Sequence, residues 1–293
     1  MAEANPNIVV VLHNGSPVEM PWIGRVKAVV EAYLGGQAVG EAAVRVLFGE
    51  VNPSGHLPES FPLRLEDNPS WLFYGGEPRA TEYREGIFVG YRYYDRKKMN
   101  VLFPFGFGLS YTTFAYSNLR LSAEQISDTD TVTATVTVKN TGDRAGKAVV
   151  QLYVGDEEGF VNAVRPVREL KGFRKVALEP GESRDVTFTL DKRAFATWRE
   201  EIHDWWVESG AFTVEVGDSV ASLPLKATLQ VESTRSLPRH FDMDSIMIDI
   251  LADPEARAVV LPLMQQFSLT GSEESSPEAK EAITEEMSTA MMQ

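Results

Sequence analysis

The chain of 293 residues contains no cysteine. Disulfide bonds, thiolate nucleophiles and cysteine-ligated metal centres are therefore excluded from its chemistry. Histidine is scarce as well, because only four are present and none lies at helical or strand spacing from a cluster of carboxylates. We therefore expect neither a metal site nor another cofactor.

Long apolar runs are also missing, since no stretch approaches the ~20 residues that cross a bilayer as a helix. Residues 1–6 lack the basic and apolar segments of a secretory signal, which slightly favours a cytoplasmic protein. Basic residues are few, with 28 Lys and Arg against 42 Asp and Glu, and the net charge is -14. This balance argues against nucleic acid and anionic membranes as partners. It is compatible with a neutral sugar substrate, although the simpler role of acidity is solubility.

Residues 7 to about 60 have the pattern of an α/β fold. Residues 8–12 form a continuous apolar run, IVVVL, which predicts a strand buried on both faces. Residues 28–33 predict a second strand, with a helical turn as the alternative. Gly35 and Gly36 then open a predicted helix. The apolar face of this helix comprises Val39, Ala42, Ala43, Val46 and Leu47.

A strand, a glycine turn and a helix in this order also occur in nucleotide-binding folds. Gly35, Gly36 and Gly40 do not have the G-x-G-x-x-G spacing, however, and no Lys-Ser or Lys-Thr pair follows as in a P-loop. We therefore interpret these glycines as residues that allow a tight turn and close packing.

Residues 61–115 are rich in aromatic residues, proline and glycine, and their weak periodicity predicts a loop-like region. Rigid aromatic side chains with polar tips suit both sugar faces and protein interfaces. We favour packing between domains for this group. Its members are Trp71, Phe73, Tyr74, Tyr83, Phe88, Tyr91, Tyr93 and Tyr94.

Residues 116–231 predict an all-β sandwich. Residues 131–138, TVTATVTV, alternate strictly between threonine and apolar residues, as expected for a strand with one buried face. Further strands are predicted at 148–154, 186–190 and 212–216. Several short strands over ~100 residues are typical of a sandwich. The absence of a cysteine pair excludes a disulfide-bridged immunoglobulin domain but not a fibronectin type III-like one.

Residues 232–293 predict a helical tail. A first helix is predicted to start at Pro254, followed by a flexible linker at 271–276 and a last helix from Pro277. We interpret the apolar stripe of the last helix as a docking face. The apolar residues are Val259, Val260, Leu263 and Met264 in the first helix, and Ile283, Met287 and Met291 in the last.

Two ordered motif blocks carry a family resemblance. The first runs through NGSPVEMPW at 14–22, GGQ at 35–37 and LFGEVNPSGHLP at 47–58, and the second through EGIFVGYRYYD at 85–95 and FPFGFGLSYT at 103–112. Together they closely resemble the C-terminal part of a glycoside hydrolase of family 3, of the β-glucosidase type. The stretches that resemble the fibronectin III-like domain of these enzymes are ELKGF at 169–173, LEPGE at 178–182 and VESGAF at 207–212.

The resemblance implies a partial α/β sandwich domain at 1–115, a fibronectin III-like β-sandwich at 116–231 and a helical C-terminal tail at 232–293. Family members also have a TIM-like barrel, for which this chain has no counterpart. They are retaining glycosidases, which need two carboxyl groups about 5–5.5 Å apart. By the resemblance, the nucleophile Asp lies on the barrel and the acid/base Glu lies in a segment before residues 8–12. We therefore expect no catalytic residue in this chain.

An incomplete parallel sheet is expected to leave bare edges and apolar surface. The chain also resembles family members that continue further at the helical end, so it looks truncated at both ends or like one half of a split protein. We therefore expect it to recruit the missing barrel or a partner chain, to self-associate as a homo-oligomer, or to rearrange. The substrate of the complete enzyme would be a β-glycoside or an oligosaccharide.

Three carboxylates, Glu19, Glu82 and Glu85, are candidate substrate-binding residues. Glu19 follows the first predicted strand and is expected near the substrate crevice, since such crevices form at strand C-termini. Its alternative role is to accept hydrogen bonds from nearby backbone N–H groups. Glu82 and Glu85 flank Tyr83-Arg84 beside the aromatic residues, where an autonomous acid pair would have to lie. We favour their neutralisation in structural pairs with Arg84 and Arg92.

Trp205 and Trp206 allow two interpretations, a carbohydrate-stacking platform or a contact in the core, and we favour the core. For the whole chain we predict a C-terminal part of a family 3 hydrolase that is inactive alone. The alternative is a non-catalytic binding or assembly module that uses its sandwich for protein or glycan contact. An autonomous hydrolase is a third hypothesis. A module would be a stable monomer when purified, whereas a fragment would be oligomeric or poorly folded.

Overall fold

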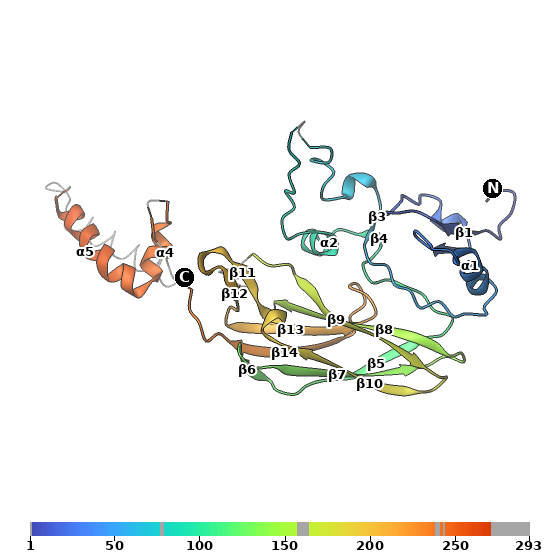
Figure 1. Cartoon of the computed structure of the whole chain (residues 1–293). Helices are drawn as coiled ribbons and strands as arrows, with labels where there is room; N and C mark the ends of the chain where they lie inside the picture. The colour runs from blue at the N-terminus through green and yellow to red at the C-terminus, as the bar shows by residue number, and fades with distance from the viewer. Residues whose placement is uncertain (1, 77–78, 157–163, 238–240, 243, 271–293) are drawn as a thin grey trace. The chain divides into compact units, whose positions relative to one another are not determined.

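The computed structural model describes residues 2–76, 79–156, 164–237, 241–242 and 244–270, with the backbone alone at 265–270. The chain divides into two units, residues 1–236 and 237–293, and each is described by itself. We call residues 2–113 the α/β portion and residues 114–232 the sandwich; both belong to the first unit (Figure 1).

The α/β portion begins with a pair of parallel strands. β1 (Val9–Leu12) and β2 (Ala28–Glu31) pair in register, with Val9 opposite Ala28. The predicted burial of this apolar run on both faces is wrong, because Val9 is 48% exposed and the rest of β1 is half-buried. Within the described ranges this sheet has two strands. It therefore lacks the neighbouring strands and covering helices that bury such runs in larger parallel sheets.

The predicted helix is present as α1 (Val39–Leu47), which follows β2 and the short η1 turn (Ile23–Arg25) in the chain. Its apolar residues recur at helical spacing, yet none of its residues is buried. Phe48, directly after the helix, is 81% exposed. The sequence thus forms the helix locally, while the surface that would bury its apolar face is not provided by the described residues.

Residues 61–103 contain more structure than the predicted loop. β3 (Phe61–Pro62) pairs with β4 (Val101–Phe103), and η2 (Leu65–Asp67) lies between them. A helix, α2 (Tyr91–Lys97), corrects the loop prediction directly. Its tyrosine-rich sequence has low helix propensity and no side-chain cap, so local pattern did not reveal it. Burial of Tyr91 and Tyr94 stabilises it instead.

The sandwich consists of a three-stranded sheet, in the order β10-β7-β5, and a five-stranded sheet, in the order β6-β14-β13-β8-β9. The predicted fold class, α/β followed by a fibronectin III-like sandwich, is confirmed. The strands are β5 (Phe114–Leu121), β6 (Gln125–Ser127), β7 (Val132–Asn140), β8 (Gly146–Asp156), β9 (Arg168–Leu178), β10 (Ser183–Leu190), β13 (Gly210–Gly217) and β14 (Leu225–Glu232). The short α3 (Lys192–Phe195), β11 (Thr197–Arg199), η3 (Glu200–Ile202) and β12 (Asp204–Trp206) join β10 to β13.

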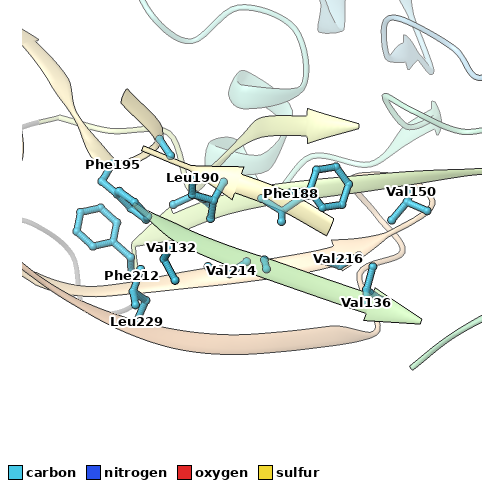
Figure 2. Packing of buried hydrophobic residues seen from close by; sticks show 14 of the residues in the cluster. Val132, Val136, Val150, Phe188, Leu190, Phe195, Phe212, Val214, Val216 and Leu229 are labelled. Atoms are coloured by element: carbon cyan, nitrogen blue, oxygen red, sulfur yellow. The ribbon is translucent and has the colours of Figure 1, made fainter. Parts of the chain in front are cut away.

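The core of the sandwich lies between its two sheets (Figure 2). β7 alternates as its sequence predicts, so that Val132, Val136 and Val138 are fully buried while its threonines face outward. Phe212 from β13 packs edge-on against Phe195, with ring centroids 5.2 Å apart. Apolar side chains from both sheets thus interdigitate and exclude water, which is the main stabilising term for this fold.

The second unit contains α4 (Met247–Ala252) and α5 (Pro254–Thr270). The predicted helix start is confirmed, because the Asp253 carboxylate accepts hydrogen bonds from the backbone N–H of Glu255 and Ala256, both at 2.9 Å. The predicted apolar face is not buried, since Val259 and Leu263 are exposed. The linker at 271–276 and the last helix lie outside the described residues. No described helix is long and apolar enough to span a membrane.

Candidate functional site

Glu19 lies on the connection between β1 and β2. Its carboxylate accepts a hydrogen bond from the backbone N–H of Leu65 at 2.6 Å, at the start of η2. The interaction joins two loops that are 46 residues apart in the sequence. Glu19 therefore holds the segment after β3 against the loop after β1.

Glu82 and Glu85 lie on the exposed segment that precedes α2. Glu82 pairs with Arg84 at 2.5 Å, as predicted, and the Arg84 guanidinium lies 4.4 Å from the centre of the Phe73 ring. The pairing predicted for Arg92 is wrong, because Arg92 contacts Glu169 of the sandwich at 3.0 Å. Helix α2 places the Arg92 side chain next to Glu169 of strand β9.

The three candidate carboxylates do not form one cluster in the structure. Across the described ranges, no hydrogen bond or ion pair joins Glu19 to Glu82 or Glu85. In the same residues, no group of three His, Asp or Glu side chains is arranged to hold a metal ion. A substrate-binding role of these residues stays a prediction.

A polar cluster that sequence reasoning missed lies where β1 and β2 end. Asn14 follows β1, Glu31 is the last residue of β2, and Tyr33 comes two residues later. Because the strands are parallel, their carboxyl ends lie at the same edge of the sheet. The Glu31 carboxylate accepts a hydrogen bond from the Tyr33 backbone N–H at 2.8 Å.

Glu59, just before β3, completes this polar cluster. Its carboxyl group faces the Tyr33 hydroxyl, although the two do not form a well-aligned hydrogen bond. Burial is the main cause that raises the pKa of Glu59. The neighbouring Tyr33 hydroxyl lowers this pKa, and the negative charge of Glu31 raises it. Burial and the same acids also raise the pKa of Tyr33. The sequence signal for this cluster was the position of polar residues directly after two predicted parallel strands.

Residues from two of the motif stretches, 47–58 and 103–112, form a first joint between the α/β portion and the sandwich. The Asn52 side-chain amide donates to the Ala145 carbonyl at 3.0 Å. Its oxygen accepts from the Ser110 hydroxyl at 2.9 Å and from the Tyr111 backbone N–H at 2.8 Å. Asn52 of the NPSG motif thus fastens the second motif block to the β7–β8 turn.

A second joint holds α2 against β9. The Tyr91 hydroxyl accepts a hydrogen bond from the Leu170 backbone N–H at 2.8 Å, beside a β-bulge between β8 and β9. Arg168 lies between Asp95, at 3.2 Å, and Glu215, at 2.7 Å. Burial raises the pKa of Asp95, which the positive charge of Arg168 opposes.

Glu169 extends the second joint. It pairs with Arg92 and with Lys171, both at 3.0 Å. Burial acts to raise the pKa of Glu169, but the two basic groups outweigh burial and hold the pKa below its ordinary value. Tyr91 of the predicted aromatic group thus packs between the α/β portion and the sandwich, as predicted, whereas Trp71, Tyr74 and Tyr83 of that group are exposed.

The two adjacent tryptophans are packing residues. Trp206 is 7% exposed and donates its indole N–H to the Arg235 carbonyl at 2.8 Å. Trp205 packs against the sandwich core and carries the Arg193 guanidinium 3.5 Å from its ring centre. Trp198 meets Trp205 edge-on across β11 and β12, with centroids 5.8 Å apart. Neither Trp205 nor Trp206 offers a free face like that of a sugar-stacking platform.

Family comparison matches both portions of the first unit. Residues 1–111 match the glycosyl hydrolase family 3 C-terminal domain, and residues 148–220 match the fibronectin type III-like domain. The order of these domains, together with the fold above, defines the chain as a C-terminal portion of a glycoside hydrolase family 3 protein.

Individual relatives agree with this assignment. The chain is 53% identical over 268 residues to the thermostable β-glucosidase B of Acetivibrio thermocellus, which covers 92% of this chain and 35% of that protein. It is 48% identical to a probable β-glucosidase I of Aspergillus clavatus, over 80% of this chain and 28% of that protein. The crystal structure of the Bifidobacterium adolescentis family 3 β-glucosidase superposes with a TM-score of 0.79 at 44% identity, covering 88% of this chain and 38% of that one.

The chain therefore belongs to glycoside hydrolase family 3 and spans about a third of the length of the curated relatives that it matches. The first unit ends at residue 236, about four fifths of the chain. A match over 92% of the chain therefore includes part of the second unit, so the Acetivibrio thermocellus enzyme shares sequence with the tail.

Proposed function

We propose that this chain acts as part of a retaining β-glucosidase-type hydrolase and has no glycosidase activity without the rest of the enzyme. The substrate would be a β-glycoside or an oligosaccharide with a β-linked sugar at its end. The remaining two thirds of the protein would supply the barrel and both catalytic carboxylates. Relatives that are named β-glucosidases and extend well beyond the matched region support this proposal.

The observation that carries the proposal is the distribution of exposed apolar side chains. Of the large hydrophobic residues exposed in the described ranges, most lie in the α/β portion. A surface of this kind is typical of a contact with further protein. The set before residue 90 comprises Val9, Leu34, Val44, Leu47, Phe48, Val51, Leu63, Leu65, Trp71, Leu72, Tyr74, Tyr83, Ile87 and Val89.

We further propose that Glu19, Glu82 and Glu85 lie on the substrate side of the complete enzyme. Glu82 and Glu85 share their segment with exposed Tyr83 and Ile87, which supports a position at the contact with the barrel. There they would orient substrate hydroxyl groups, for which carboxylates are good acceptors. They are not proposed as the reacting acid pair.

The test compares this chain alone with a chimera. In the chimera, this chain replaces the matched region of the Acetivibrio thermocellus enzyme. Nitrophenol release is measured with aryl β-glucosides, β-xylosides and α-arabinosides. We expect turnover by the chimera and none above buffer by the chain alone.

The carboxylates provide the control. Turnover by the purified chain alone that falls in Glu82→Gln or Glu85→Gln would show an autonomous acid pair and contradict the proposal. A chain that stays a stable monomer and binds glycan, while the chimera is folded but inactive, would instead favour the non-catalytic module. Raised KM with Glu82→Gln or Glu85→Gln in the chimera is the result expected from substrate contact.

A further inference from the structure

The polar cluster at the carboxyl ends of β1 and β2 is held in a defined geometry. The Asn14 side-chain amide donates to the Ser16 carbonyl at 2.8 Å, so this hydrogen bond uses the amide nitrogen and not the amide oxygen. One Glu31 oxygen accepts from the Tyr33 backbone N–H at 2.8 Å, which leaves the second oxygen free to accept elsewhere. Edge-on packing of Tyr33 against the buried Phe61, at 6.5 Å, fixes the ring.

Three buried polar atoms of this cluster have no hydrogen-bond partner within the described residues. They are the Asn14 side-chain oxygen, the second Glu31 oxygen and the Tyr33 hydroxyl. Buried polar atoms are nearly always paired in a complete fold, because leaving them unpaired opposes folding. Two of the three can only accept, so the missing neighbour must be a donor.

The cluster also lacks a positive charge. In the part of the chain that the structure describes, neither Glu31 nor Glu59 has a Lys, Arg or His within ion-pair distance. The second joint of this unit, by contrast, contains a cation, because Arg168 lies between Asp95 and Glu215. Two half-buried acids beside unsatisfied acceptors are complementary to a cation that carries several donors, and a guanidinium fits this description best.

An exposed apolar side chain lies at the cluster. Leu34, which follows Tyr33 and is 81% exposed, lies beside Gly15, the residue after Asn14. A charged group docked here would be shielded from water once a protein surface covered these residues, which would strengthen its interaction with the acids.

We propose that Asn14, Glu31 and Glu59 form an anchor for an arginine or lysine side chain supplied by the rest of the family 3 enzyme. This inference rests on the proposed function, and the occupant follows from two observations. About two thirds of the length of the Acetivibrio thermocellus relative lies outside the region that this chain matches. The anchor presents acceptors and negative charge next to exposed apolar surface, which selects a protein surface with a basic side chain. Tyr33, whose hydroxyl faces the Glu59 carboxyl group, is a positioning residue.

The experiment measures assembly of two separate chains. This chain is mixed with the remainder of the Acetivibrio thermocellus β-glucosidase B, expressed without the matched region. Affinity is measured by calorimetry and by recovered hydrolysis of nitrophenyl β-glucoside. We expect Glu31→Gln and Glu59→Gln each to weaken assembly on the order of tenfold or more, because a buried charge on the partner would lose its counterion.

Two matched variants separate the anchor from a general charge effect. Glu41→Gln on α1 removes the same charge from a carboxylate that already pairs with Arg45 at 2.8 Å, so assembly should be unchanged. Tyr33→Phe removes one unpaired buried hydroxyl. It should leave the isolated chain at least as stable in a thermal melt and still weaken assembly, a combination that a purely structural tyrosine would not give.

The outcomes distinguish the anchor from the proposed function. Assembly with full activity that Glu31→Gln and Glu59→Gln leave intact would overturn the anchor alone. Failure of the unsubstituted chain to assemble or restore activity would overturn the proposed function and the anchor with it. Sedimentation showing a homodimer of this chain that Glu31→Gln dissociates would place a second copy in the anchor and overturn the inference.

Discussion

The sandwich and the α/β portion differ sharply in how many of their apolar residues are buried. Of 31 buried hydrophobic residues in the described ranges, four lie in the α/β portion and 27 in the sandwich. The exposed large hydrophobic residues are distributed in the opposite way, with 16 in the α/β portion and three in the sandwich. The sandwich therefore buries its own apolar residues. The described part of the α/β portion has apolar residues in the pattern of a buried fold but leaves most of them exposed.

The largest effect is expected from a pair of phenylalanine substitutions that contrasts the two regions. Phe212→Ala should lower the free energy of unfolding by about 3–5 kcal/mol, because it opens a cavity beside Phe195 in the sandwich core. Phe48→Ala should change the isolated chain by less than ~0.5 kcal/mol, since that ring is 81% exposed. Urea denaturation of both variants measures the difference.

Measuring Phe48→Ala again in a chimera tests whether the α/β portion is covered by further protein. In the chimera with the Acetivibrio thermocellus remainder, Phe48→Ala should become clearly destabilising because the ring is then covered. Equal, small effects of Phe48→Ala in the isolated chain and in the chimera would show that this part of the α/β portion stays bare, contrary to our account.

An intermediate effect is expected at the joint between the two regions. Arg168→Met removes the cation between Asp95 and Glu215 and leaves two acids facing each other. We expect a loss of about 1–3 kcal/mol, less than for a fully buried pair because these side chains keep some solvent contact. Chemical denaturation of the variant checks this loss, and Arg120→Met on the exposed sandwich surface serves as the control, with little change.

The smallest effect concerns pH. The raised pKa of Glu59 means that the folded chain binds a proton here more tightly than the unfolded chain does. Its contribution to stability is therefore full below the ordinary glutamate pKa of about 4.3 and is lost as the pH rises through the raised value. Glu59→Gln should raise the melting temperature on the order of 1–2 °C at pH 7 and have little effect at pH 4.

At each pH, the melting temperature of the parent is subtracted from that of the Glu59→Gln variant, so that the effects of the other carboxylates cancel. A Glu59→Gln variant that is less stable than the parent at pH 7 would contradict the burial of an unpaired charge at this position.

The sequence predicted the fold where local pattern and tertiary packing agree. The alternation at 131–138 predicts β7, because the sandwich buries one face of that strand. β9 was not predicted, since its charged residues and the register shift at Lys171, opposite Leu152 and Tyr153 of β8, hide the period of two. α2 was not predicted because burial of Tyr91 and Tyr94 outweighs their weak helix propensity.

The candidate site shows a similar division. Motif reasoning singled out Glu82 and its pairing with Arg84, which the structure confirms, because neighbours in sequence pair without help from the fold. It missed the meeting of Glu31, Tyr33 and Glu59, which requires the parallel pairing of β1 with β2 and the return of the chain at β3. Contacts of this kind depend on strand order, which single residues do not reveal.

Hydrogen exchange tests the central claim, that the α/β portion is completed by the rest of the enzyme, most directly. Amide exchange is followed in the isolated chain and in the chimera under the same conditions. We predict that β7 and β8 are protected to the same degree in both, while β1, β2 and α1 exchange fast in the isolated chain and become strongly protected in the chimera. Equal protection of β1, β2 and α1 in the two proteins would contradict the account.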